Sequence, residues 1–301
     1  MNEIINGEEA KHVYKTIQYQ FPVNEGRMRR QQLDGLIMER TVTSHFIPDI
    51  LGFCGIAQLM EYMPAGNLND YFKHAQLAGG STLAPVDKLR LAIHLASGVA
   101  ALHTMDGTAR PAFFHNDLSS HQFLFGDGYF QLNDFHMAEA ILVDRTTGET
   151  CPPKRTRVLQ KNSPPEQHQL ALRHPDYVPA NPATTTNDVW MLGNVIYTTL
   201  TDWNLFPKPL FLNLAETSRE LVAGRRSPYP KLIQDSRDPS HMAMKQAVEM
   251  CWTHNATARP TASSVTEYLL QKLREITGED APELRVVLPA RAEDPAPTSD
   301  N

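Results

Sequence analysis

Short apolar runs separated by polar turns mark the N-terminal part of the chain. Residues 13–15 (Val-Tyr-Lys) indicate a short strand, and two more strand-like runs follow Pro48, at residues 49–55 and 56–63. Between them, residues 27–44 repeat apolar positions at helical spacing, with charged residues elsewhere. The pattern therefore predicts a small sheet accompanied by one helix.

The rest of the chain has mainly helical periodicity. Residues 85–104 predict a helix, because Pro85 suits the first turn and the apolar residues form one face. Residues 64–75 predict a turn and then a helix, with Asn67 or Asn69 near its start. Further helices are predicted at residues 187–201, 242–252 and 262–276.

Two segments lack this periodicity. Residues 144–187 are rich in Pro, Thr, Arg and Asn, and they predict a long irregular segment of the kind that is usually functional. Residues 277–301 are acidic and rich in Pro and Ala, with few large apolar residues, so they predict a disordered tail.

A short hairpin is predicted between two aspartates. The runs QFLF and YFQL are joined by Gly126-Asp127-Gly128, and a DG turn between apolar runs is typical of a hairpin. Asp117 precedes the hairpin and Asp134 follows it. In phosphoryl transfer, one aspartate can orient the attacking hydroxyl and another can hold Mg²⁺ through oxygen ligands. A hairpin between the two would fix their separation.

Composition narrows the class of protein. The chain has 301 residues, 41% of them hydrophobic and 21% charged, which is typical of one large globular domain or of two lobes. A net charge of -6 argues against a general nucleic-acid binder, because phosphate backbones require clustered Lys and Arg. No run of eighteen apolar residues predicts a membrane segment, and the polar N-terminus does not have the pattern of a signal peptide. We therefore expect a cytoplasmic protein.

The three cysteines agree with that compartment. Cys54, Cys151 and Cys251 are far apart, odd in number and form no CxxC. They are expected to be free thiols in a reducing environment rather than a metal site or a disulfide framework.

The residues around the hairpin resemble the protein kinase superfamily. Residues 115–122 (HNDLSSHQ) resemble the family's catalytic loop H-R-D-L-x-x-x-N, and residues 134–136 (DFH) resemble its D-F-G. The resemblance implies that Asp117 is catalytic and that Asp134 and Gln122 bind the metal. It also implies that His115 and Phe135 are structural.

Other landmarks occur in the same order along the chain. Residues 163–166 (SPPE) resemble A-P-E, residues 188–193 (DVWMLG) resemble D-V-W-S-F-G, and Cys-Trp before Arg259-Pro resembles the C-W…R-P near the end of the domain. The last two are most similar to tyrosine-kinase-like families. The resemblance implies a buried Glu166–Arg259 ion pair and implies that Asp188 caps the catalytic loop.

The resemblance also covers the N-terminal part. Residues 59–68 (LMEYMPAGNL) resemble the gatekeeper and hinge, with Met60 as gatekeeper and the backbone of Glu61 to Met63 facing adenine. Lys15 resembles the lysine of V-A-I-K and Glu39 the glutamate of the C-helix. Lys15 equally fits an exposed strand lysine, and Glu39 fits a solvated helix glutamate.

The implied fold is α+β and bilobal. It has an N-terminal remnant (1–10), a truncated β-rich N-lobe (11–63), a mainly helical C-lobe (64–276) and the tail (277–301). The resemblance extends from residue 11 to about residue 272, and its ordered landmarks argue against chance. A narrower likeness to kinase-like proteins of diatoms and related algae is also present. The resemblance implies ATP and Mg²⁺, or Mn²⁺, as cofactors and a protein as substrate or partner; the oligomeric state is not indicated.

The Gly-rich loop G-x-G-x-x-G is missing. A single glycine, Gly7, precedes Lys15, so either the sequence is truncated or the lid over the phosphates is absent. Lys15 and Glu39 are 24 residues apart, and this long gap implies an insertion before the helix.

Four motif residues also depart from the family pattern. Asn116 replaces the arginine of H-R-D, Ser119 a lysine that helps to hold the γ-phosphate, Gln122 the metal-binding asparagine, and His136 the glycine of D-F-G. Two hypotheses follow. The chain is an active, divergent kinase that acts on Ser, Thr or Tyr, or it is a pseudokinase that serves as an interaction module.

Overall fold

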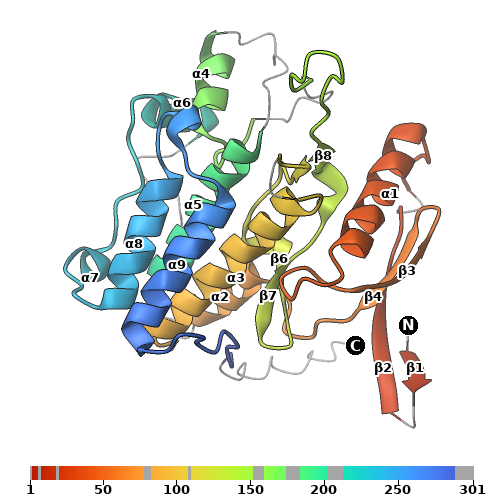
Figure 1. Ribbon diagram of the computed structural model, residues 1–301, viewed down its shortest axis with the longest axis horizontal. Helices are drawn as coiled ribbons and strands as arrows, with labels where there is room; N and C mark the ends of the chain where they lie inside the picture. The colour runs from red at the N-terminus through yellow and green to blue at the C-terminus, as the bar shows by residue number, and fades with distance from the viewer. Residues whose placement is uncertain are drawn as a thin grey trace, which may run out of the picture.

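The computed structural model describes residues 2–5, 8–17, 20–77, 83–107, 110–151, 159–173, 184–202 and 213–288. A small sheet with one helix lies on one side, and a larger helical part lies on the other (Figure 1). This arrangement confirms the predicted α+β class, with a strand-rich N-lobe and a mainly helical C-lobe. Within the described residues, no helix is both long and apolar enough to cross a bilayer.

Four antiparallel strands form the N-lobe sheet. They are β1 (Asn2–Ile5), β2 (Glu8–Lys15), β3 (Ile50–Cys54) and β4 (Ala57–Glu61), in the order β1-β2-β4-β3. The strand predicted at 13–15 is thus the end of a longer one, and the predicted remnant 1–10 contains β1 and the start of β2. Most of β2 is polar, so it lacks the apolar alternation that predicts strands, and its pairing with β4 specifies it instead.

Helix α1 (Glu25–Arg40) packs against β3 and carries part of the site. Asn24 caps its first turn by accepting a hydrogen bond from the Arg27 amide. The helix ends four residues before the predicted residue 44. The hydroxyl and the amide of Thr41 both donate to the Ile37 carbonyl there, which closes the last turn.

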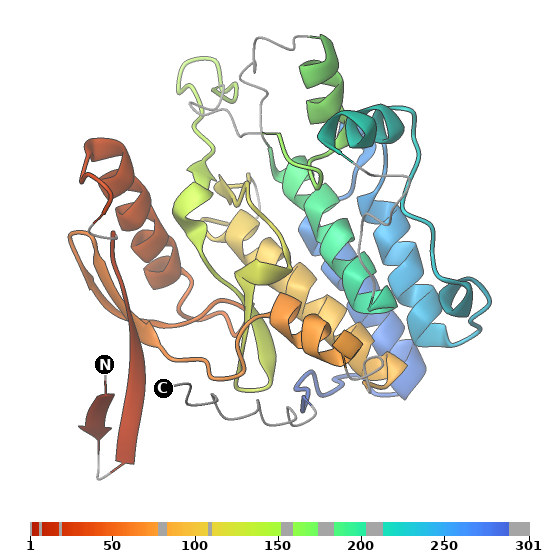
Figure 2. The same ribbon diagram turned by 180° about the vertical axis from the view of Figure 1, so that it is seen from behind.

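The C-lobe is built around α3 (Pro85–Thr104), whose predicted bounds are confirmed. Helices α5 (Thr185–Thr201), α8 (Pro239–Cys251) and α9 (Ala262–Thr277) pack against it, as Figure 2 shows from behind. The described residues also form helices α2 (Leu68–Leu77), α4 (Pro165–Arg173), α6 (Leu214–Val222) and α7 (Lys231–Gln234). Of these, α4 lies inside the segment that was predicted to be irregular.

The predicted hairpin is confirmed. Strands β6 (Phe123–Gly126) and β7 (Tyr129–Leu132) pair antiparallel, and Asp127 and Gly128 take the positive φ angles that an Asp-Gly turn provides. Beside it, β5 (Phe113–Phe114) pairs with β8 (Glu139–Ala140). The described part of the lobe also contains the short 3₁₀ turns η1 (Ser120–Gln122), η2 (Phe135–Met137) and η3 (Ala256–Ala258).

The tail prediction for residues 277–301 is wrong for residues 277–288. Gly278, with φ 71°, ends α9, and the chain then returns along α3 to the hairpin (Figure 1). The segment is held by backbone hydrogen bonds and by one buried side chain, Val286, and a composition average does not detect either. Residues 289–301 lie outside the described residues.

Candidate active site

The side chain of Asp188 holds the loop that carries Asp117. This fully buried carboxylate, from the first turns of α5, accepts hydrogen bonds from the His115 amide (2.6 Å) and the Asn116 amide (2.9 Å). His103 of α3 contacts the same carboxylate at 3.0 Å. Asn116 has a left-handed φ of 66°, a conformation that persists only where its surroundings fix it. The capping role expected of Asp188 is therefore seen in its contacts.

His115 is a buried structural residue. Its Nδ1 accepts from the Asp117 amide at 3.3 Å, so its Nε2 carries the hydrogen and donates to the Asn133 carbonyl at 3.1 Å. Burial lowers the pKa of the imidazole, although nearby carboxylates act in the opposite direction. The ring also packs against Phe135, with centroids 5.4 Å apart. The neutral ring links the catalytic loop to the end of β7.

Asp117 and Gln122 lie on the same loop. The side-chain Nε2 of Gln122 is 3.5 Å from Asp117 Oδ2. The main-chain carbonyl of Gln122 accepts a hydrogen bond from the main-chain amide of Asn133 at 2.8 Å. Both side chains are partly exposed. The two candidate residues before the hairpin are thus next to each other, and Gln122 is joined to the strand end that leads to Asp134.

Asp134 forms the charged centre of the site. It has φ 66° and ψ 64°, and its Oδ1 accepts from Lys15 Nζ at 2.6 Å and from His136 Nδ1 at 2.8 Å. Burial acts to raise the pKa of this carboxyl, but the His136 hydrogen bond and the Lys15 ammonium outweigh it and hold the pKa well below its ordinary value. The hydrogen bond to Asp134 raises the pKa of His136 in turn.

Lys15 pairs with Asp34, and the predicted pair with Glu39 is wrong. Lys15 Nζ is 2.7 Å from Asp34 Oδ2, and the other oxygen of this fully buried carboxylate accepts from the Phe135 amide at 2.6 Å. Glu39 is exposed. Five residues along a helix is a rotation of about 140°, so Asp34 and Glu39 cannot both face the sheet.

Asp34 could have been found from its position in the sequence. It lies between Leu33 and Ile37, on the apolar stripe of the helix, where an acidic residue requires a partner. Burial acts to lower the pKa of Lys15, but Asp34 and Asp134 together outweigh it and raise that pKa. The lysine is therefore charged and is held between two carboxylates.

The expected hinge runs past the hairpin. Met60 on β4 is buried and lies opposite Val13 of β2, while Glu61 at the strand end is exposed. Met63 is buried against Gly126, where an added Cβ would come within 3.1 Å of the methionine Cε. Met63, two residues after β4, therefore packs against the last residue of β6, at the turn end of the hairpin.

The ion pair predicted at the base of the C-lobe is formed. Arg259 is bidentate to Glu166, with Nη1–Oε1 at 3.0 Å and Nη2–Oε2 at 3.2 Å. Its Nη1 and Nε also donate to the Thr186 and Thr253 carbonyls, and its side chain is fully buried. The pair fixes the start of α4 against the loop before α9.

The donor chemistry fits a metal that arrives with a nucleotide. Mg²⁺ takes oxygen ligands and is usually held by one or two carboxylates together with substrate phosphates. Asp134 and Gln122 provide a carboxylate and an amide oxygen. Over the residues that the structure describes, no group of three His, Cys, Asp or Glu side chains forms an all-protein metal cluster.

Comparison with known proteins agrees with this geometry. A family model described as protein tyrosine and serine/threonine kinase matches residues 11–269. The tyrosine-protein kinase Abl of Drosophila melanogaster is 26% identical over 229 residues, which are 75% of this chain and 12% of that protein. The serine/threonine-protein kinase PBL27 of Arabidopsis thaliana is 27% identical over 247 residues, 78% of this chain and 45% of that protein.

The chain thus spans less than half the length of these two relatives, and the match runs through both lobes. The ordered motifs, the capped catalytic loop and the family match agree, and the chain belongs to the protein tyrosine and serine/threonine kinase family.

Proposed function

We propose that the chain transfers the γ-phosphoryl group of ATP to a Ser, Thr or Tyr hydroxyl of a protein. The observation that carries the proposal is the assembly of five side chains at the open end of the hairpin. Asp117 and Gln122 lie before β6, and Asp134, with its partners Lys15 and Asp34, lies after β7. Phosphoryl transfer depends on positioning and electrostatic stabilisation, and these are the groups that it requires.

Each side chain has a role that its contacts support. Asp117, on a loop fixed by Asp188, orients the substrate hydroxyl and accepts its proton. Lys15, fixed by the buried Asp34, binds the α and β phosphates. Asp134 and Gln122 would hold Mg²⁺ or Mn²⁺, which when bound neutralises charge on the phosphates.

Adenine binds along the hinge in this proposal. Met60 closes the back of the pocket and the backbone of Glu61 to Met63 forms hydrogen bonds with the base, while Met63 stays packed on Gly126. Lys15 then exchanges its contact with Asp134 for phosphate oxygens, and keeps its contact with Asp34.

A second candidate function is favoured by one observation. Asp134 Oδ1 already accepts from two donors, Lys15 Nζ and His136 Nδ1, and His136 stands where the family has glycine. Asn116 and Ser119 also replace an arginine and a lysine of the family motif. In this second candidate function the chain is a pseudokinase, and its fold serves as an interaction module.

Nucleotide binding is the first test. ATP is titrated with and without Mg²⁺, and the unfolding temperature is measured for wild type, Asp134→Asn and the control Asp235→Asn, an exposed aspartate remote from the site. A ligand that binds the folded form raises its stability by mass action. We expect a metal-dependent shift in wild type and in the control that is lost in Asp134→Asn.

Transfer of labelled phosphate to the chain itself and to generic protein substrates then separates the two functions. Turnover that disappears in Asp117→Asn supports the kinase. Metal-dependent binding without turnover, or turnover that Asp117→Asn leaves unchanged, refutes the catalytic proposal, and the first of these outcomes supports the pseudokinase.

A further inference from the structure

The segment after α9, residues 283–286, lies across α3 and the tip of the β6–β7 hairpin. Arg90 Nε donates to the Glu283 carbonyl at 2.8 Å, and the Leu284 carbonyl is 2.7 Å from His94 Nε2. The Val286 amide donates to the Gly128 carbonyl at 2.9 Å. We call residues 283–286 the strap. Three of its backbone groups form hydrogen bonds, two with α3 and one with the turn of the hairpin.

His94 connects the strap to the hairpin. Its Nδ1 accepts from the Phe130 amide at 3.2 Å, so its Nε2 carries the hydrogen and donates to the Leu284 carbonyl. The ring is fully buried and packs against Tyr129, with centroids 5.1 Å apart. One neutral imidazole thus bridges the strap and β7.

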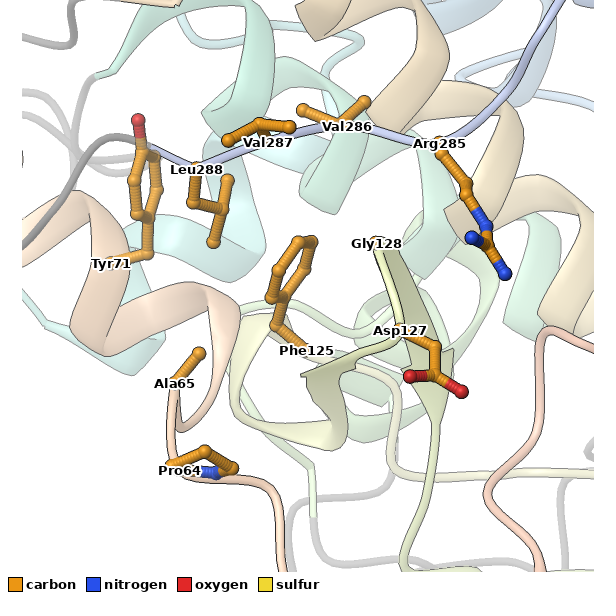
Figure 3. A pocket seen from close by; sticks show the side chains of 10 residues that line it. All are labelled: Pro64, Ala65, Tyr71, Phe125, Asp127, Gly128, Arg285, Val286, Val287 and Leu288. Carbon is orange, nitrogen blue, oxygen red and sulfur yellow. The ribbon is translucent and has the colours of Figure 1, made fainter.

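The tip of the hairpin is shaped to receive the strap. Gly128 has φ 86°, and an added Cβ would lie 3.2 Å from the Cβ of Arg285. Val286 is 3% exposed, whereas its neighbour Val287 is 91% exposed. Figure 3 shows residues 285–288 crossing from the Asp127–Gly128 turn towards Tyr71 of α2.

Residues 285–288 line one side of a pocket, so this side of the strap is not covered by the other residues that the structure describes. The pocket has a volume of about 670 Å³ and is lined mainly by apolar side chains, among them Phe125, Tyr71 and Leu288 (Figure 3). The attachment of the strap therefore depends on α3 and on the hairpin tip, and a change at Val286 should release it.

The far end of the hairpin carries the proposed metal residues. Gln122 directly precedes β6 and Asp134 follows β7 by two positions, and the Asn133 amide joins the two strand ends through the Gln122 carbonyl at 2.8 Å. Because each strand of the hairpin has only four residues, we expect the hairpin to move as one unit. Contacts that fix its turn should therefore also fix the positions of Gln122 and Asp134 at its open end.

We propose that the strap and His94 are positioning elements: by holding the hairpin on α3, they set the placement of Gln122 and Asp134. The part of this inference that concerns nucleotide rests on the function proposed above. The part that concerns the order of the hairpin does not.

Hydrogen exchange without nucleotide tests the structural part on the full chain. We expect Val286→Asp to accelerate exchange of residues 123–134 by about tenfold and the matched control Val287→Asp to change it less than about twofold. Exchange in α5 should be unchanged. If Val286→Asp does not fold, Val286→Ala takes its place with an expected increase of about threefold.

Affinity for Mg-ATP tests the positioning part, with Val286→Ile as the conservative variant. We expect Val286→Asp to weaken binding by about tenfold and Val286→Ile to restore it. If Val286→Asp leaves hydrogen exchange in the hairpin unchanged, or accelerates exchange in α5 equally, the proposal that the strap holds the hairpin is refuted. Faster exchange with unchanged affinity overturns its role in placing Gln122 and Asp134. Wild type that binds no Mg-ATP refutes the proposed function, while the exchange result still decides the strap.

Discussion

Substitution of Asp34 by Asn should destabilise the fold, although the residue is not at a position where the family motif was expected. Asp34 is fully buried and holds two partners, Lys15 Nζ at 2.7 Å and the Phe135 amide at 2.6 Å. Removing one charge of a fully buried ion pair costs about 3–5 kcal/mol. Lys15 is 26% exposed and keeps Asp134, and Asn still offers an oxygen to Phe135, so we expect a smaller loss of about 2–3 kcal/mol.

The assay is urea unfolding at pH 7, followed by tryptophan fluorescence and circular dichroism. Glu39→Gln is the matched control, because Glu39 lies on the same helix, is exposed, and should change the free energy of unfolding by less than about 0.5 kcal/mol. A wild-type midpoint for Asp34→Asn, or an equal loss in Glu39→Gln, would refute the assignment of Asp34 as the partner of Lys15.

Two further predictions concern the C-lobe. Arg259→Leu should cost about 3–5 kcal/mol, because it leaves the Glu166 carboxylate and the Thr186 and Thr253 carbonyls without their donor. Glu166→Gln should cost less, because its amide oxygen still accepts from Arg259 and the guanidinium keeps both carbonyls; equal losses in urea unfolding would contradict this difference. Burial lowers the pKa of His168 to about 4, so between pH 6.5 and 4 the unfolded chain binds more protons than the folded chain, and stability should fall by up to about 3 kcal/mol as pH drops through this range. His168→Phe should flatten that fall relative to wild type in unfolding measured at pH 7, 5.5 and 4.5, and an unchanged slope would show that His168 does not titrate as inferred.

The elements with strong local signals could be predicted from the sequence. Helix α3 has a long apolar face and a proline at its start, and the hairpin has an Asp-Gly turn, so both were predicted correctly. The motif residues Asp117, Asp134 and Asp188 follow a fixed order along the chain. In the structure, the Asp188 carboxylate caps the main chain just before Asp117, and the Asn133 amide, just before Asp134, donates to the main-chain carbonyl of Gln122.

Elements that depend on partners distant in sequence could not be predicted in this way. Strand β2 is polar and exists through its pairing with β4. The family motif points to a glutamate, Glu39, as the partner of Lys15, whereas the helix face decides which acid can reach the lysine, and that acid is Asp34. The segment after α9 was assigned to the tail because one buried valine and three backbone hydrogen bonds leave almost no trace in composition.

The strap also has a practical consequence for where the domain can be cut. The family match ends at residue 269, inside α9, and the C-lobe predicted from the sequence ends at residue 276. The described structure nevertheless continues without a break to residue 288. A fragment that stops at either boundary would leave the His94 ring and the Gly128 carbonyl without their partners from the strap, and would lose the buried Val286 side chain from the core. Fragments prepared for study, and reporter domains fused at the C-terminal end, should therefore retain residues 277–288.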